Sequence, residues 1–162
     1  MRLDTFAATQ AVNITNTQAV NLSATLDRIV AAVGVQSTDN RPVGVTHMRF
    51  TFSGGSKSFS PTTGLAINDS GFTSTLDFTG SAGNTTYTGA YLFLATDEQT
   101  MNVTIETLDA VDGNVIFSKT VTDVPLKRNR ITKLTGAIYS ANASTDSFQV
   151  NGIWLADHGI DF

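Results

Sequence analysis

Two histidines are the side chains of this 162-residue sequence best suited to acid–base chemistry. His47 lies on the polar face of an alternating segment, and His158 follows Asp157 in the C-terminal tail. Catalysis needs a base, a nucleophile and a group that stabilises developing charge to converge. No spacing typical of a nucleophile elbow, a zinc protease or a phosphate-binding loop is present. We therefore interpret both histidines as exposed side chains and predict that the chain is not an enzyme and binds no cofactor.

Metal chemistry finds equally little support in the sequence. Asp109, Asp112 and Asn114 imitate part of a calcium loop, but the further oxygen ligands and the terminal glutamate are missing. Asp112 and Gly113 instead favour a tight hairpin turn, because this dipeptide accepts positive φ angles. The chain has no cysteine, which excludes disulfides, thiol catalysis and cysteine-based zinc sites. We predict no metal site.

A short basic run, Lys127, Arg128 and Arg130, is the remaining candidate for ligand chemistry, as an anion site. The chain as a whole carries a net charge of -4 and has a pI near 4.9. Such a chain has no general attraction for phosphate backbones. We interpret the run as a solvated corner and exclude nucleic acid as a partner.

The elements that position these residues are predicted to be strands. Hydrophobic residues make up 41% and charged residues only 15% of a chain rich in Thr, Ser, Val and Gly, which favours an all-β protein. Apolar residues recur at two-residue spacing, with turns about every 8 to 12 residues. The fold class is predicted as all-β, a two-layer antiparallel β-sandwich of Greek-key, transthyretin-like topology with about seven to eight strands. The expected strands lie in residues 24–35, 45–53, 72–78, 87–94, 101–106, 115–121 and 131–139.

The segment from Asp112 to Tyr139 organises the prediction, because it contains a turn, a strand, a corner and a second strand in succession. Pro125 cannot donate a hydrogen bond to a sheet and holds Val124 in an extended conformation. The chain is therefore expected to leave the sheet at Pro125 or to run along an edge. Before this core, residues 1–23 are predicted to be an extended or poorly ordered leader that could contribute one edge strand.

A family resemblance rests on this segment. Residues 124–140 read VPLKRNRITKLTGAIYS, and upstream the chain reads LDRIVAAVGV (26–35), VTHMRFTFSGG (45–55) and FSPTTG (59–64). This pattern resembles the N-terminal domain of the Bacteroidales fimbrillins, the FimA-like subunits of type V pili, over roughly residues 26–140. One departure matters: such stalk subunits have a second sandwich, and here only about 22 residues follow residue 140. That favours a minor, accessory or tip-like subunit, or a surface lipoprotein with this domain.

The resemblance implies assembly by strand complementation. In that family a protease cuts after an arginine and removes the first strand, and a strand from another subunit fills the groove. Arg28 is the candidate cleavage point here, against the alternative of an ordinary exposed strand arginine. A donor strand could come from the tail, residues 147–162. The candidate strand-exchange contacts are Leu3, Phe6, Val12, Ile14, Val20, Leu22, Phe148, Val150, Ile153 and Leu155.

The expected organisation follows from the same resemblance: residues 1–23 as a possibly removable leader, 24–140 as the sandwich, and 141–162 as a tail with an added or donor strand. The expected function is a structural or adhesive cell-surface protein, a pilus or accessory subunit whose partners are other pilus subunits or itself. The resemblance implies export and an outer-membrane lipid anchor, whose signal and cysteine are absent from this chain. The alternative is a monomeric surface lipoprotein domain that binds a ligand such as a glycan through Tyr87, Tyr91 or Trp154.

Overall fold

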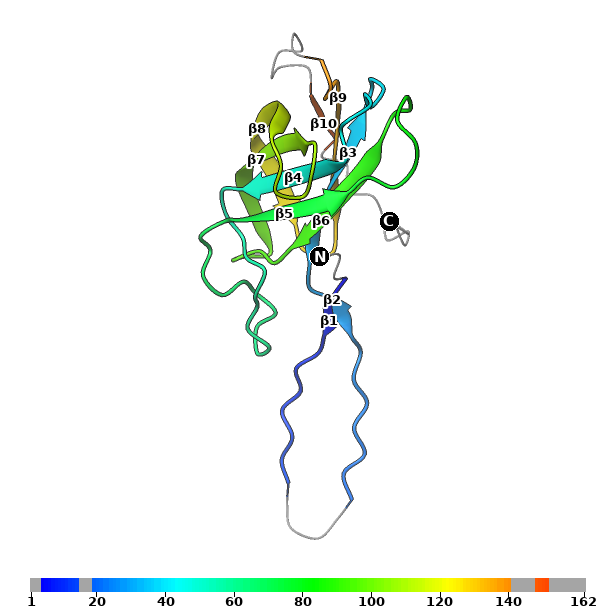
Figure 1. Ribbon diagram of the computed structural model, residues 1–162. Coiled ribbons are helices and arrows are strands. Elements are labelled where there is room, and N and C mark those ends of the chain that lie inside the picture. Colours follow the sequence, from blue (N-terminus) through cyan, green and yellow to red (C-terminus); the bar gives the residue numbers. More distant parts are fainter. Residues whose placement is uncertain (1–3, 15–18, 141–147, 152–162) are drawn as a thin grey trace.

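The computed structural model describes residues 4–14, 19–140 and 148–151, and within them every regular element is a strand. Eight strands form two four-stranded sheets, and two short strands form a small separate ladder (Figure 1). None of the described residues belongs to a helix of the length and apolarity that crossing a membrane requires. The strands are β1 Phe6–Ala7, β2 Asp27–Arg28, β3 Ala31–Ser37, β4 His47–Phe52, β5 Phe72–Asp77, β6 Tyr87–Leu92, β7 Glu98–Leu108, β8 Val115–Lys127, β9 Ile131–Gly136 and β10 Gln149–Asn151.

The two sheets have the orders β10-β9-β3-β6 and β5-β4-β7-β8. Their inner faces meet in a single core, which confirms the predicted β-sandwich. Alternation explains the packing: in β4, Met48, Phe50 and Phe52 are buried, while the residues between them are only half-buried. One pairing differs from the predicted antiparallel pattern, because β3 and β9 run parallel. β9 therefore joins the sheet beside the first strand of the sandwich.

The predicted strand over residues 24–35 is wrong in its boundaries. The structure divides it into β2 and β3, and residues 24–26 belong to neither. Ile29 and Val30, which are consecutive, are both buried in a second small cluster with Phe93. Two adjacent buried side chains break the alternation, because the chain turns there from the small ladder into the sandwich.

The hairpin between β7 and β8 is present, but its glycine serves a different purpose from the one predicted. The φ angle of Gly113 is not in the left-handed region. A Cβ at Gly113 would instead overlap the Asp109 carboxylate, whose Oδ1 accepts a hydrogen bond of 2.7 Å from the Asn114 backbone N. Pro125 lies within β8, which is an edge strand. Of the two predicted alternatives, the chain therefore runs along an edge and does not leave the sheet at Pro125.

Candidate association surfaces

The N-terminal arm, defined as residues 8–14 and 19–26, projects away from one end of the sandwich (Figure 1). Neither limb of the arm is in a strand, and every described residue in it is exposed. The large apolar side chains of the arm are between 40% and 80% exposed: Val12, Ile14, Val20, Leu22 and Leu26. Single exposed apolar side chains are common, but a contiguous group of them marks a surface that a partner can cover.

Arg28 fastens the arm to the sandwich. Its Nε donates to Asp4 Oδ1 at 2.8 Å, its Nη1 donates to Asn129 Oδ1 at 3.3 Å, and its guanidinium lies 4.9 Å from the centre of the Phe6 ring. Its backbone pairs with Phe6 in the small ladder. A protease that cuts after Arg28 must therefore first open this base, and cleavage there stays a prediction.

The other predicted contacts divide between the arm, the tail and undescribed positions. Phe6 is half-exposed at the base of the arm, and Val12, Ile14, Val20 and Leu22 lie along it. Phe148 is buried in the core, whereas Val150 is exposed in β10. The remaining predicted contacts lie outside the described residues: Leu3, Ile153 and Leu155.

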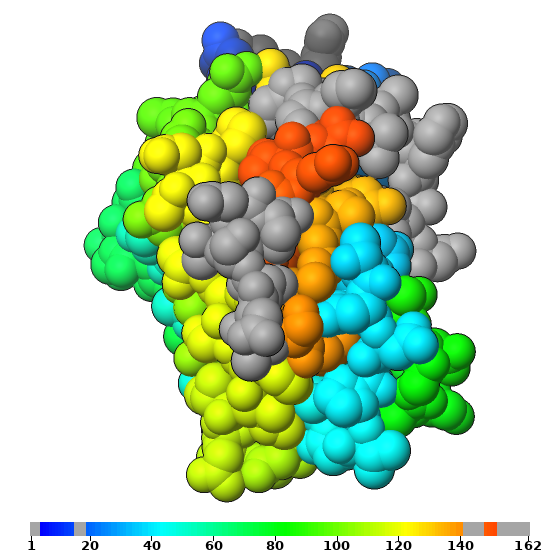
Figure 2. All heavy atoms as spheres, turned by 90° about the horizontal axis from the view of Figure 1, so that it is seen from above, coloured from blue at the N-terminus to red at the C-terminus, as the bar shows by residue number. Residues whose placement is uncertain are grey.

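The C-terminal strand lies on the chain's own sandwich. β10 pairs antiparallel with β9, with Val150 opposite Leu134. In Figure 2 the red-orange segment of β10 lies beside the orange residues of β9. Phe148 packs over Gly136, where a Cβ would come within 3.0 Å of the phenyl ring. β10 thus covers the outer edge of β9, and the described tail folds back rather than standing free.

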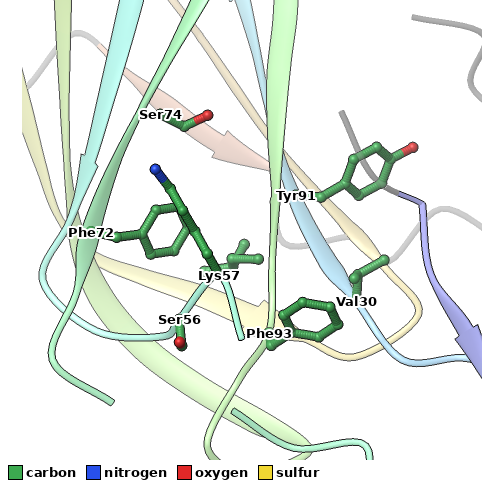
Figure 3. A pocket seen from close by; sticks show the side chains of 8 residues that line it. Val30, Ser56, Lys57, Phe72, Ser74, Tyr91 and Phe93 are labelled. Atoms are coloured by element: carbon green, nitrogen blue, oxygen red, sulfur yellow. The ribbon is translucent and has the colours of Figure 1, made fainter. Parts of the chain in front are cut away.

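A seam opens on the opposite side of the molecule, where β5 and β6 are the edge strands of the two sheets. Figure 3 shows its pocket, with Phe72 and Lys57 on one side and Phe93 and Val30 on the other. Lys57 Nζ lies 5.4 Å from the centre of the Phe72 ring. The cavity volume is about 50 Å³, and most of the lining side chains are apolar.

The loop after β4 closes one end of this seam. Ser56 and Phe93 exchange two backbone hydrogen bonds of 3.0 Å. This loop therefore already pairs with the residue that directly follows β6. Tyr91 is the one lining residue of this pocket that the sequence predicts as a possible ligand contact. The spacing around Phe72 predicts a strand, but it does not indicate that the neighbouring edge belongs to the other sheet.

A second, more polar hollow lies at the start of β6. Its cavity volume is about 170 Å³, and its lining includes Tyr87, Thr88, Arg41 and the hydroxyl-rich loop before β6. Arg41 is buried, donates to the Val45 carbonyl at 2.7 Å and lies 4.9 Å from the centre of the Phe78 ring. Burial raises the pKa of the Tyr87 phenol. Tyr91 is half-buried in the small cluster with Ile29, and Trp154 lies outside the described residues.

The residues first considered for chemistry are engaged in structural contacts. His47 is not a simply exposed side chain: its Nε2 lies 2.9 Å from Asp77 Oδ1 and its Nδ1 lies 2.7 Å from the Thr46 hydroxyl. Asp109 accepts hydrogen bonds from Asn114, which lower the pKa of its carboxyl group. Within the described part of the chain, no three metal-ligating side chains gather.

The basic run is paired with the acidic start of β7. Lys127 forms an ion pair with Glu98, and Arg128 Nε lies 3.4 Å from Asp97 Oδ1. Arg130 Nη1 donates to the Asn129 carbonyl at 2.9 Å. These contacts agree with a solvated corner rather than an anion site.

Comparison with known proteins gives a family and a fold. A crystal structure of a "putative cell adhesion protein" from Bacteroides ovatus ATCC 8483 superposes with a TM-score of 0.50 at 12% sequence identity. The match covers 85% of this chain and 49% of the other, so this chain spans about half of that protein's length. At this identity the likeness shows the fold. Among curated proteins, none matches. The model of a family of unknown function, DUF6562, matches residues 2–157, and the chain belongs to that family.

Proposed function

We propose that this chain is a structural or adhesive protein of the cell surface, a fimbrillin-like pilus subunit or accessory subunit that associates with other subunits through extended strands. The observation that carries the proposal is the uncharged projecting arm with its exposed apolar side chains. The adhesion role printed for the Bacteroides ovatus protein of similar fold supports a surface location and an adhesive role.

The sheet edges supply the second half of the proposal. Edge strands present main-chain groups to which another strand can add, and side-chain pockets give such an addition its specificity. The seam between β5 and β6 offers an edge next to a small, mostly apolar pocket. An extended segment of another subunit, with branched aliphatic side chains at alternate positions, fits that surface.

The proposal is tested by light scattering of the full chain over a concentration series. We expect the mass to rise with concentration, and we expect an arm-deleted variant to stay monomeric. In this variant an Asn-Gly turn joins Ala7 to Asp27, which are paired in the small ladder. A full chain that stays monomeric at the highest soluble concentration would contradict the proposal. Treatment with an arginine-specific protease, followed by sequencing of the new N-terminus, tests cleavage after Arg28.

A second candidate function is glycan binding by a monomeric surface domain. The observation that favours it is the polar hollow beside Tyr87, which has a volume of about 170 Å³. Arg41 and a loop rich in hydroxyl groups line it beside the Tyr87 ring, and such a lining suits a polar ligand. Binding on a glycan array that is lost in Tyr87→Ala and kept after arm deletion would support this function over the first.

A further inference from the structure

The two limbs of the arm carry nearly the same sequence. Residues 9–14 read TQAVNI and residues 17–22 read TQAVNL, so the segment repeats after eight residues. Because eight is an even number, the repeat keeps each residue type on the same side of an extended chain. No charged residue, glycine or proline occurs between Asp4 and Asp27. Uncharged segments of this kind are prone to pair as strands.

The register of the small ladder determines which residues of the two limbs can meet. Phe6 pairs with Arg28, and Ala7 pairs with Asp27. If the same register is extended along both limbs of the arm, Val12 lies opposite Leu22 and Ile14 lies opposite Val20. Residues directly opposite each other in an antiparallel pair share one face.

All the exposed large apolar side chains of the arm then fall on one face of the resulting ribbon, because every one of them has an even number. The opposite face consists of alanine and short polar residues. The apolar face carries Ala8, Gln10, Val12, Ile14, Val20, Leu22, Ala24 and Leu26, and the polar face carries Thr9, Ala11, Asn13, Ala19, Asn21, Ser23 and Thr25.

We infer that the arms of two copies zip into two-stranded ribbons and pack against each other through these apolar faces. The inference rests on the proposed function, in which copies associate, and it names the arm of a second copy as the partner of the arm. An isolated two-stranded ribbon is marginal in water, which agrees with the absence of strands in the two described limbs of the single chain.

A second copy fits this face in both charge and area. Two identical uncharged faces meet without charge repulsion. A two-fold axis brings the same face of both copies into contact, so each contact occurs twice. Five large side chains from each copy would bury on the order of 1,000 Å² in total. That area lies at the lower limit for a specific interface, so the dimer depends on concentration.

Engineered cysteines test the register, because the chain contains none of its own. Gln10 and Ala24 are opposite each other in the continued register, on the apolar face. Ile29 N donates to Thr5 O across the ladder, so the even-numbered pairs are the non-hydrogen-bonded ones with the closer side chains. We expect the double variant Gln10→Cys, Ala24→Cys to form an intrachain disulfide under conditions of association. The matched variant Gln10→Cys, Thr25→Cys places its thiols on opposite faces and should not. Equal oxidation of both variants would overturn the register.

A mixing experiment tests the partner surface. The arm-deleted variant retains β1, β2 and both sheets, and circular dichroism checks that it folds. We expect it not to bind the full chain, whereas two full chains dimerise. Within the full chain, Val20→Asn with Leu22→Asn should weaken dimerisation at least about tenfold, and the polar-face control Asn21→Ser with Ser23→Thr should leave it unchanged.

The outcomes separate the two proposals. Binding of the arm-deleted variant to the full chain would show that the arm docks on a sandwich, which overturns the ribbon pairing and leaves the proposed function standing. Sedimentation of monomeric full chain with neutral phosphatidylcholine vesicles would assign the apolar face to a membrane and also overturn the pairing. A full chain that stays monomeric in the mixing experiment and does not sediment with vesicles overturns the pairing together with the proposed function.

Discussion

Two buried threonine hydroxyl groups in the core differ in whether they form a hydrogen bond. Thr107 in β7 is fully buried, and its Oγ1 has no hydrogen-bond partner among the described residues. Thr132 in β9 is equally buried, but its hydroxyl donates to the Pro125 carbonyl at 2.6 Å. A buried polar group costs free energy unless it is hydrogen-bonded. The same substitution should therefore have opposite effects at the two positions.

We predict that Thr107→Val raises the free energy of unfolding by about 1 kcal/mol and that Thr132→Val lowers it by about 1 kcal/mol. Valine has nearly the same shape as threonine, so the comparison isolates the hydroxyl group. Urea unfolding of both variants measures the two changes. Shifts of the same sign would show that packing rather than hydrogen bonding decides the outcome.

Asp109 predicts a pH dependence for the turn between β7 and β8. The side-chain and then the backbone hydrogen bond from Asn114 hold the pKa of its carboxyl below the ordinary value of 3.8. A lowered pKa means that the carboxylate stabilises the folded state above pH 3.8 and that this contribution is lost as the pH falls through the folded pKa. We expect the difference in unfolding free energy between the native chain and Asp109→Asn to be constant near neutral pH and to shrink below about pH 3.8. A difference that stays constant down to pH 2 would contradict the assignment.

At the scale of elements, strands with one buried face were predictable from the sequence, and positions where the chain changes its partner were not. β4 and β5 begin and end within two residues of their predicted ends, because apolar and polar residues alternate along both. The start of β3 was misplaced, because Ile29 and Val30 are buried against a loop rather than in a sheet face. The parallel pairing of β9 with β3 and the seam between β5 and β6 depend on which edges meet, which local spacing does not encode.

The tail strand gives the prediction that belongs to this scale. Phe148, the residue before β10, is 9% exposed and packs in the core, so its removal should release β10 from β9. We expect Phe148→Ala to lower the free energy of unfolding by about 3 kcal/mol and Phe148→Leu by less. Hydrogen exchange at residues 133–135, which face β10, should accelerate in the alanine variant. Unchanged exchange there would mean that β9 is protected without its neighbour.

The charged side chains of the described residues lie on the sandwich and at the base of the arm, and the arm itself carries none. Several charged side chains of the sandwich form ion pairs, as in the 2.7 Å contact between Arg49 Nε and Glu106 Oε2. That hydrogen bond to Glu106 also raises the pKa of Arg49. The arm, by contrast, has no charge between Asp4 and Asp27. Association through the arm must therefore rely on apolar burial, whereas association through the sandwich surface would bring charged groups together.

Salt dependence distinguishes these two modes of association. Added sodium chloride screens charged contacts, with a Debye length that falls from ~10 Å at 0.1 M to ~3 Å at 1 M, but it hardly affects apolar burial. Sulfate strengthens apolar burial, because it is excluded from the protein surface. We expect the dimer dissociation constant to change less than about twofold between 0.1 M and 1 M sodium chloride and to fall in ammonium sulfate, as measured by sedimentation equilibrium. A dissociation constant that rises steeply with sodium chloride would place the contact on the charged surface of the sandwich, because only charged groups respond to screening in that direction.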